Sequence, residues 1–551
     1  MAVAVCERPA AELPGVLQAL RIDYAAAVFS TIDLTTSPPK VDIPREYNVA
    51  VDLLQRHVIE GRGDRIAVID ADGAHSYARL ADRAWRAATA LRDLGVMPEQ
   101  RVALCMLDTA ELPALLLGAM ALGAVPIPLN TLNTTDDYRY QLRDSRARAL
   151  VVSDCLVDKL APAIADAPAL AAVAVARTPL GGDPGRFPRW EPLVEQASPL
   201  ATVATTTSDD VAFWLYSSGS TGKPKGAMHL HSSPVHTAAL YARAVLGITP
   251  DDVVFSAAKL FFAYGFGNSL TFPFSVGATA VLLADRPTPA TVIETLRRHR
   301  PTIFCGVPTL FASLLADPAL GRIDRLRIST SAGEALPRHI GERWRERMGS
   351  DILDGIGSTE LLHIFLSNRP NDVAYGTTGR PVPGYDLELR GDDGSPVPEG
   401  ESGSLWVRGP SACIGYWNDR TRTLATFHGP WTRTGDRYER DADGRWTYSG
   451  RSDDMLKVGG IWVSPFEVES ALAAHPSVLE AAVIGHEDAD GLTKPRAFVV
   501  FKPGATAEVT ELQAFVKTRL APFKYPRWVD IVDELPKTAT GKIQRFKLRA
   551  R

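Results

Sequence analysis

The sequence has little of what marks several other protein classes. Its 551 residues include only five cysteines, which are far apart and never spaced as CxxC or as a Cys/His ligand pair. This pattern predicts neither a disulfide framework nor a zinc site, and it fits a reducing, cytoplasmic location. Strong charge is absent too, because 60 basic and 64 acidic residues leave a formal net charge of −4. We therefore expect no nucleic-acid partner and no membrane-surface partner for the chain as a whole.

Long hydrophobic runs and targeting signals are also missing. The longest apolar stretch, residues 113–128, is broken by glycine and proline, and the opening MAVAVCERPAAELPG lacks a basic segment followed by an apolar core. We expect no export signal and no membrane span. With 45% hydrophobic and 23% charged residues, the chain has the composition of a globular protein large enough for more than one domain.

What the sequence does contain is an alternation of strand and helix patterns. From residue 65 onward, short β-rich runs alternate with segments such as residues 76–94, whose apolar residues recur at helical spacing. This alternation predicts an α/β fold, α+β overall, in which helices cover parallel sheets. A loop-rich passage, residues 178–210, separates two βα blocks, and a strand-rich stretch follows at residues 387–408.

Near residue 451 the pattern of the sequence changes again, and a second compact unit of β and α segments begins. We therefore expect four parts in the chain. They are an N-terminal extension (1–42), a large domain of βα subdomains plus a β-rich subdomain (43–450), a hinge (451–453) and a small, mobile C-terminal α/β domain (454–551).

One stretch has a composition suited to holding an anion. It is YSSGSTGKPKG, residues 216–226, in which glycines let backbone N–H groups turn inward, hydroxyls donate and two lysines bring positive charge. It follows a predicted buried strand, residues 212–216, as phosphate-binding loops often do. It is not a Walker motif, because Gly222 follows Gly219 too soon and Pro224 takes the position of the metal ligand. The alternative, a surface linker, does not need two lysines and a proline in a fixed frame.

Four further motifs give this loop a context. They are SAGEALP (331–337), DGIGSTE (354–360), RTGD (433–436) and GRSDDMLK (450–457). In this order and spacing, the set resembles the adenylate-forming superfamily, which contains acyl- and aryl-CoA ligases, firefly luciferases and the adenylation domains of peptide synthetases. The resemblance runs from about residue 43 to the end. It implies that a carboxylate first attacks the α-phosphate of ATP to give an acyl adenylate, from which AMP later leaves.

The resemblance also implies roles for individual residues. Lys542 matches the lysine that bridges the carboxylate and the α-phosphate, where two anions need cationic shielding. Glu360 matches the carboxylate that helps to hold Mg²⁺ and is expected to be catalytic, as is Thr221. The expected nucleotide-binding residues are Ser217, Ser218, Gly219, Ser220, Gly222, Lys225, Gly333, Glu334, Ala335, Asp354, Gly355, Ile356, Thr359, Asp436 and Arg451.

Two of these nucleotide contacts need comment. Asp436 would accept hydrogen bonds from both ribose hydroxyls, with Arg451 beside it. Without the other motifs, we would interpret these residues as a turn aspartate and a surface arginine. Ile356 stands where the wider family commonly has an aromatic residue, so the stacking on adenine should be weaker.

After adenylation, the small domain of the family swings about a hinge position that matches Asp453 here. The phosphopantetheine arm of CoA would then enter beside Gly459 and Gly460, where the absence of side chains leaves room. Phe523 matches a position that packs against the CoA adenine. Tyr525 stands where some relatives carry an arginine, so the CoA-phosphate contacts stay open among Arg496, Lys524 and the basic tail.

Two stretches narrow the resemblance to the benzoate- and hydroxybenzoate-CoA ligases: KLFFAYGFGN (259–268) and LLHIFLSN (361–368). An aromatic wall opposite glycine and alanine suits a ring better than a flexible chain, and no aspartate is present at 262–265 to hold an amino acid. The expected lining of the slot for the acid is Phe262, Ala263, Tyr264, Ala332, Gly357, His363 and Ile364.

Three histidines have alternative interpretations. His363 is equally compatible with a structural role and with a polar role beside the acid. His229 and His231 have the spacing of a metal-binding pair, but no third ligand is apparent and packing is the favoured interpretation.

The leading hypothesis is an ATP- and Mg²⁺-dependent aryl-CoA ligase for benzoate or a hydroxy- or aminobenzoate. Its partners would be a small aromatic carboxylic acid and CoA, and the oligomeric state stays open, with a homodimer as one option. An aryl-adenylating enzyme that loads a carrier-protein phosphopantetheine is the alternative. A catalytically silent nucleotide-binding protein is a third, disfavoured because Lys542, Glu360 and Asp436 are all present.

Overall fold

The computed structural model describes residues 29–217, 223–451, 454–458, 461–488, 492–520, 524–537 and 543–549. The described chain begins with a short antiparallel hairpin of β1 and β2, followed by a helical segment that leads into the first sheet strand. The bounds are β1 (Thr31–Asp33), β2 (Lys40–Asp42), η1 (Val51–Gln55) and α2 (Arg56–Ile59).

The first βα block builds a four-stranded parallel sheet in the order β6-β5-β7-β8. β5, β6 and β7 are buried or nearly buried along their lengths, as expected of parallel strands covered on both faces. The elements are β5 (Arg101–Cys105), α4 (Glu111–Ala121), β6 (Val125–Pro128), α5 (Thr135–Ser145), β7 (Ala149–Ser153), η2 (Asp154–Leu156), α6 (Val157–Ala165) and β8 (Ala172–Ala176). The passage predicted to be loop-rich contains one helix, α7 (Trp190–Gln196).

A larger, nine-stranded sheet follows the order β17-β16-β15-β14-β13-β11-β12-β3-β4. Its centre is parallel, whereas β15-β16-β17 and β3-β4 pair antiparallel at the two ends. The strands are β3 (Ile66–Asp70), β4 (Gly73–Ser76), β11 (Val253–Ser256), β12 (Thr279–Val281), β13 (Ile303–Gly306), β14 (Ile328–Ser331), β15 (Ile352–Gly357), β16 (Ile364–Ser367) and β17 (Arg380–Pro381). β3 therefore precedes the first parallel sheet in the chain but pairs with β12, a strand from much later in the chain.

Helices connect and cover these strands. They are α3 (Tyr77–Asp93), α8 (Ser233–Thr237), η3 (Ala238–Arg243), α9 (Ala263–Phe266), η4 (Gly267–Thr271), α10 (Phe272–Val276), α11 (Pro289–His299), α12 (Pro308–Ala316) and α13 (Arg338–Met348). Between the two sheets, β9 (Val211–Ser217) and β10 (Lys225–Leu230) form an antiparallel hairpin, so the predicted phosphate loop connects two paired strands.

The β-rich part predicted near residues 387–408 is a five-stranded antiparallel sheet. It contains β18 (Asp386–Arg390), β19 (Gly403–Arg408), β20 (Phe427–His428), β21 (Trp431–Arg440) and β22 (Trp446–Arg451), with α14 (Arg420–Thr426) before β20.

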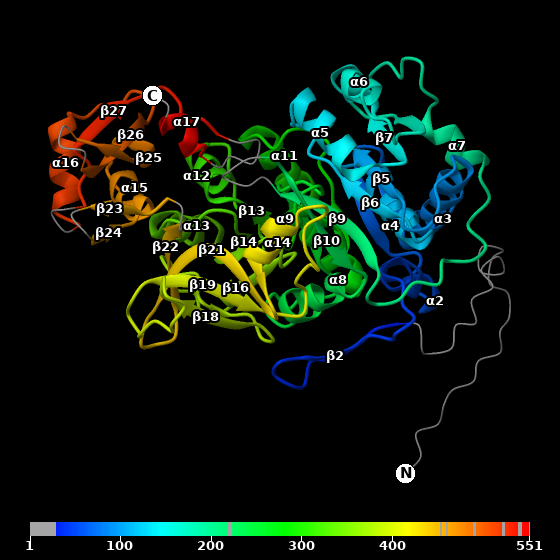
Figure 1. The fold of residues 1–551 in the computed structure, drawn as a ribbon, viewed down its shortest axis with the longest axis horizontal. Helices are drawn as coiled ribbons and strands as arrows, with labels where there is room; N and C mark the ends of the chain where they lie inside the picture. Colours follow the sequence, from blue (N-terminus) through cyan, green and yellow to red (C-terminus); the bar gives the residue numbers. More distant parts are fainter. Residues whose placement is uncertain are drawn as a thin grey trace, which may run out of the picture.

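The chain after residue 454 forms a separate small unit with its own buried clusters. It lies at the end of the molecule opposite the β5–β8 sheet (Figure 1). Its elements are β23 (Leu456–Val458), β24 (Ile461–Val463), α15 (Pro465–Ala473), β25 (Val478–Glu487), β26 (Thr493–Phe501), α16 (Val509–Lys517), β27 (Trp528–Ile531) and α17 (Arg545–Arg549). The predicted fold class, a large α/β domain with a β-rich part and a small C-terminal domain, is confirmed. The residue bounds that we assign to the four parts stay predictions.

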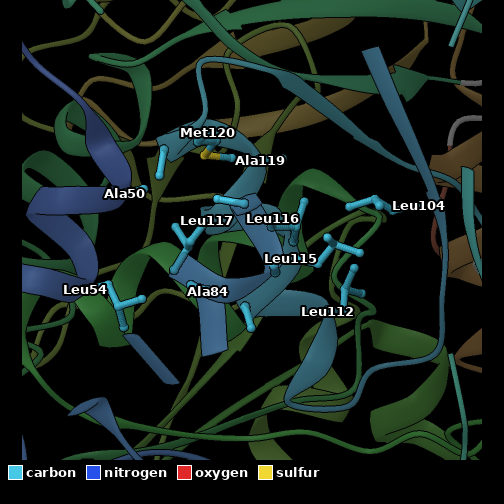
Figure 2. Close-up of a cluster of buried hydrophobic side chains, with 14 of the residues drawn as sticks. Ala50, Leu54, Ala84, Leu104, Leu112, Leu115, Leu116, Leu117, Ala119 and Met120 are labelled. Atoms are coloured by element: carbon cyan, nitrogen blue, oxygen red, sulfur yellow. The ribbon is translucent and has the colours of Figure 1, made fainter. Parts of the chain in front are cut away.

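The large core is centred on α4, whose residues from Leu112 to Ala121 are all buried. Figure 2 shows its leucines packed among side chains of η1, α3 and β5. Among the residues that the structure describes, none of the helices combines the length and the apolar character that a bilayer crossing requires. α4 is apolar on all sides because it is a buried core helix of the protein.

Gly118 lets α4 approach α3 closely. A Cβ at Gly118 would collide with the carbonyl oxygen of Ala84 and lie 3.2 Å from the nitrogen of Ala88. Both are backbone atoms of a long helix, so neither can move without shifting α3.

We predict that Gly118→Ala lowers the free energy of unfolding by about 1–3 kcal/mol, because overpacking against backbone cannot relax locally. The matched control is Gly321→Ala, since Gly321 has no atom within 4 Å of a Cβ and no positive φ. Denaturant unfolding of both variants measures the difference, and equal stabilities would contradict the close-approach argument.

Candidate active site

A cavity of about 1690 Å³ lies between the large part of the chain and the small C-terminal unit. Its walls come from the β9–β10 hairpin, the ends of β14 and β15, the β21–β22 pair and the small unit. The predicted site residues that line it are Ser217, Lys225, Phe262, Gly333, Glu334, Ala335, Asp354, Gly355, Ile356, Gly357, Thr359, Glu360, Asp436 and Arg451. Motifs far apart in the sequence therefore meet in one cavity.

The sheet topology explains why two of the motifs converge. β14 and β15 are parallel neighbours, so SAGEALP and DGIGSTE occupy the same carboxyl edge of the sheet. Gly333 has φ +96°, a backbone conformation that favours glycine. The predicted adenine-binding segments therefore lie side by side.

The electrostatic centre of the cavity is a cluster of Lys225, Glu360 and Tyr416. The Tyr416 hydroxyl donates to Glu360 Oε1 at 2.7 Å, Lys225 Nζ donates to the same hydroxyl at 3.1 Å, and Lys225 Nζ lies 3.6 Å from Glu360 Oε1. Burial alone would raise the pKa of Glu360, but the Lys225 charge and the Tyr416 hydroxyl outweigh it and hold that pKa below its usual value. Glu360 is thus kept ionised inside the protein.

Tyr416 is a site residue that the sequence reasoning missed. It lies 191 positions after Lys225 and reaches it through an antiparallel bridge between Ala227 and Tyr416. No local pattern marks such a residue, because its position depends on pairing between distant segments.

A second contact anchors the start of the phosphate loop. Tyr216, at the end of β9, lines the cavity and donates to Asp144 Oδ2 of α5 at 2.6 Å. The next residue, Ser217, has a buried hydroxyl oxygen without a partner among the described residues. Ser217 lines the cavity at the start of the loop predicted to bind phosphate, and a hydroxyl there could donate to one.

Asp354 is the buried polar group at the predicted adenine position. Its side chain is 5% exposed, and Oδ1 has no partner within the described parts of the chain. Burial raises the pKa of Asp354 well above its usual value. An unpaired acceptor or donor is therefore present where the amino group of adenine is expected.

Asp436 and Arg451 face each other because β21 and β22 pair in that register. Arg451 Nη1 donates to Asp436 Oδ1 at 3.2 Å, and the Asp436 side chain is 12% exposed. Both line the cavity, so a largely buried acidic side chain and a cation stand together where the ribose is expected.

Only some of the residues predicted to line the slot for the aromatic acid reach this cavity, and the others are buried next to it. Phe262 and Gly357 line the cavity, whereas Ala332, His363 and Ile364 are buried at 5% exposure or less. Tyr264, Ala332 and Ile364 belong to one hydrophobic cluster. Ala263 packs on a different cluster. The structure therefore brings most of these residues together around a compact apolar region.

His363 sits in an aromatic cage within this region. Its ring centroid lies 4.4 Å from that of Phe272, 5.4 Å from Tyr264 and 5.5 Å from Tyr241. Burial lowers the pKa of His363 to about 3, so the ring is neutral. Nε2 must donate to the Tyr264 carbonyl at 3.3 Å, which leaves Nδ1 as a buried acceptor unpaired among the described residues.

His229 and His231 are both packed inside the protein. His229 Nε2 donates to the Thr359 carbonyl at 2.8 Å, and His231 Nδ1 accepts from the Val49 N–H at 3.1 Å. Within the described ranges, no group of three or more His, Cys, Asp or Glu side chains could hold a metal ion. His229 instead supports the segment that carries Glu360.

Several predicted site residues lie outside the described part of the chain. They are Ser218, Gly219, Ser220, Thr221, Gly222, the hinge residue Asp453, Gly459, Gly460, Phe523 and Lys542. Two candidates for the CoA phosphates are described and already paired: Arg496 Nε lies 2.7 Å from Asp530, and Lys524 Nζ lies 2.6 Å from Glu467.

Comparison with known families agrees with this geometry. The AMP-binding enzyme model matches residues 54–417, and the AMP-binding enzyme C-terminal domain model matches residues 467–542. The chain therefore belongs to the AMP-binding enzyme family, which confirms the resemblance to the adenylate-forming superfamily.

Individual relatives are similar over almost the whole chain. A benzoate–CoA ligase of Thauera aromatica is 55% identical over 95% of this chain and 99% of its own length. The crystal structure of a benzoate CoA ligase from Burkholderia xenovorans LB400 matches with a TM-score of 0.85 and 53% identity, covering 91% of this chain and 99% of that one. The structure of the anthranilate CoA ligase AuaEII in complex with anthranoyl-AMP matches with a TM-score of 0.89 and 40% identity, covering 92% and 98%.

The two lysines of the phosphate loop give a matched test. Lys225 is 18% exposed and touches Glu360 and Tyr416, whereas Lys223 is exposed and lies over the Tyr140 ring, 5.1 Å from its centroid. We predict that Lys225→Met raises KM for ATP by about tenfold or more, because it removes a charged contact and leaves Glu360 buried without a cation.

Lys223→Met should leave KM for ATP within about twofold, since exposed cation–π contacts are weak. The control measurement is KM for the aromatic acid, which Lys225→Met should change much less than KM for ATP. A larger effect on the acid than on ATP would mean that the loop is not at the phosphates.

Proposed function

We propose that this chain is an AMP-forming aryl-CoA ligase that activates benzoate, or a benzoate with a small hydroxy or amino substituent, and transfers it to CoA. One observation carries the proposal: an ionised, cation-paired Glu360 and the Asp436–Arg451 pair line the same cavity, beside a compact aromatic region. The similarity to benzoate– and anthranilate–CoA ligases over nine-tenths of the chain supports this choice of acid.

In the first half-reaction, a carboxylate oxygen of the acid attacks the α-phosphorus of ATP. The bond from that phosphorus to the bridging oxygen breaks, and pyrophosphate leaves. Ser217 and Lys225 lie at the two ends of the predicted phosphate loop, where they would hold the departing phosphates. Asp436 with Arg451 would fix the ribose. Lys542 would shield the two anions as they meet.

In the second half-reaction, the thiol of CoA attacks the acyl carbon and AMP leaves. The thioester, AMP and pyrophosphate are the products. A small domain that turns about the hinge position would exchange Lys542 for the glycine pair Gly459 and Gly460, which admits the phosphopantetheine arm. ATP and CoA are thus both substrates.

The residues present fit Mg²⁺. Glu360 is one ionised carboxylate at the cavity wall, and Mg²⁺ usually takes one or two carboxylates plus substrate phosphates and water. We propose that Glu360 would help to hold the ion, which would supply positive charge to neutralise charge that develops in the transition state.

The acid should be small and flat. His363 is packed between Phe272, Tyr264 and Tyr241, and such rigid aromatic walls suit a ring better than a flexible chain. Its unpaired Nδ1, and the amide of Asn268, which is 1% exposed and unpaired among the described residues, provide polar contacts for a ring substituent. A cytoplasmic location remains a prediction from the sequence, and the oligomeric state stays open, with a homodimer as one option.

The direct test offers purified enzyme benzoate, ATP, Mg²⁺ and CoA. We expect stoichiometric benzoyl-CoA, AMP and pyrophosphate, identified by mass. Release of AMP without benzoyl-CoA, together with aryl transfer to a phosphopantetheinylated carrier protein, would support the carrier-loading alternative instead.

A second test separates the half-reactions. We predict that Lys542→Ala slows adenylate formation by about 10²-fold or more, the usual size of a lost charge-stabilising contact. Thioester formation from supplied benzoyl adenylate should change far less, because the lysine is expected to have left the site by then. Equal losses in both half-reactions would contradict the assigned role.

A further inference from the structure

The Tyr416 hydroxyl stands between the two charged groups at the centre of the cavity. It donates to Glu360 Oε1 at 2.7 Å and accepts from Lys225 Nζ at 3.1 Å. Lys225 Nζ itself lies 3.6 Å from Glu360 Oε1, whereas a direct hydrogen bond between such charged groups is about 2.8 Å long. The lysine and the carboxylate are therefore joined through the tyrosine more closely than they are joined to each other.

The backbone around Tyr416 is attached to the segments that carry both partners. Tyr416 forms an antiparallel bridge with Ala227 of β10, the strand that begins at the lysine. On the other side, the Cys413 N–H donates to the backbone carbonyl of Glu360 at 2.8 Å. The short segment 413–417 thus spans the two sides of the cluster and fixes where the tyrosine lies.

The Tyr416 side chain is also held in place by packing. Its residue is 4% exposed, its ring centroid lies 5.5 Å from that of Phe427, and Lys225 Nζ lies 4.4 Å from its ring centroid. Burial and the neighbouring Glu360 charge raise the pKa of Tyr416, so the hydroxyl keeps its proton. A protonated hydroxyl has one hydrogen to give to the carboxylate and a lone pair for the ammonium group.

Both charged partners keep capacity for a further ligand in this arrangement. Lys225 and Glu360 line the cavity, with side chains that are 18% and 15% exposed. The contacts of Lys225 and Tyr416 with the carboxylate fall on Oε1, so neither of them occupies Oε2. The ammonium group has more N–H donors than the one that it directs at the tyrosine.

We infer that Tyr416 is a positioning residue that keeps Lys225 and Glu360 from neutralising each other, so that the lysine can bind phosphate while the carboxylate binds a divalent cation. The inference rests on the proposed function, because it concerns the ATP and the Mg²⁺ that this reaction uses. Tyr416 acts through its two partners and needs no contact with the substrate.

The test removes only the Tyr416 hydroxyl. In Tyr416→Phe the ring still fills its place, but nothing holds the ammonium and the carboxylate apart, and we expect them to form a direct contact. The matched control is Tyr385→Phe. Tyr385 is also buried, at 5% exposure, and its hydroxyl contacts only a neutral partner in the structure described, Ser411 Oγ at 2.6 Å.

The first measurement is calorimetric binding of ATP with Mg²⁺ to the full-length enzyme, without acid or CoA, so that no turnover occurs. We expect Tyr416→Phe to weaken this binding about 10- to 100-fold, the usual effect of removing a contact that supports a metal-binding carboxylate. Tyr385→Phe should stay within about twofold of the unmodified enzyme, because distant sites act independently. The melting temperatures of the two variants should be similar, since each loses one buried hydroxyl.

Two further readouts separate positioning from stability. In turnover, Tyr416→Phe should raise KM for ATP and leave KM for benzoate within about twofold. In a Glu360→Gln background, the same change should weaken ATP binding by less than about threefold, because no carboxylate is left for the lysine to contact.

A crystal structure of Tyr416→Phe should show Lys225 Nζ closer to the carboxylate than 3.6 Å. Undiminished ATP binding by Tyr416→Phe, additive losses with Glu360→Gln, or an unchanged lysine–carboxylate distance would overturn the inference. Absence of benzoyl-CoA from the products of the unmodified enzyme would instead refute the proposed function.

Discussion

The structure depends most on the way Glu360 is kept charged inside the protein. A carboxylate removed from water is costly unless a cation and hydrogen bonds compensate it, and here Lys225 and the Tyr416 hydroxyl provide both. The three residues come from β10, the segment after β15 and the segment before α14. The contacts around this one charge therefore join the predicted phosphate loop, the segment after β15 and the segment that leads into the β-rich sheet. The Lys225–Glu360 ion pair that joins these segments also places the Lys225 cation beside the predicted phosphates.

In the proposed reaction, the chemistry would divide between the large and the small domain. The large domain supplies the groups that would hold the nucleotide throughout, such as the Asp436–Arg451 pair set by the β21–β22 register. In that reaction the small domain would supply Lys542, whose charge would be needed while two anions approach and would be in the way when CoA enters. In the proposed reaction, a cation on a separate, rotating unit would meet both requirements.

Much of this arrangement could be predicted from the sequence, because the signals are local. The strand before the phosphate loop, the helix over Tyr77–Asp93 and the β-rich stretch all follow periodic patterns, and the structure contains them. The meeting of the motifs in one cavity followed from the family resemblance. The sequence could not reveal that β3 joins β12, that Tyr416 reaches Lys225 or that Tyr216 reaches Asp144. These contacts join segments far apart in the chain, and each side of the contact looks ordinary by itself.

The central claim is that the carboxylate of an aromatic acid becomes bonded to the α-phosphorus of ATP before CoA enters. The most direct measurement uses benzoate labelled with heavy oxygen in both carboxylate positions, with mass analysis of the products. The account predicts AMP that carries one heavy oxygen and benzoyl-CoA that retains the other. Unlabelled AMP, with the heavy oxygen in phosphate or pyrophosphate, would contradict it.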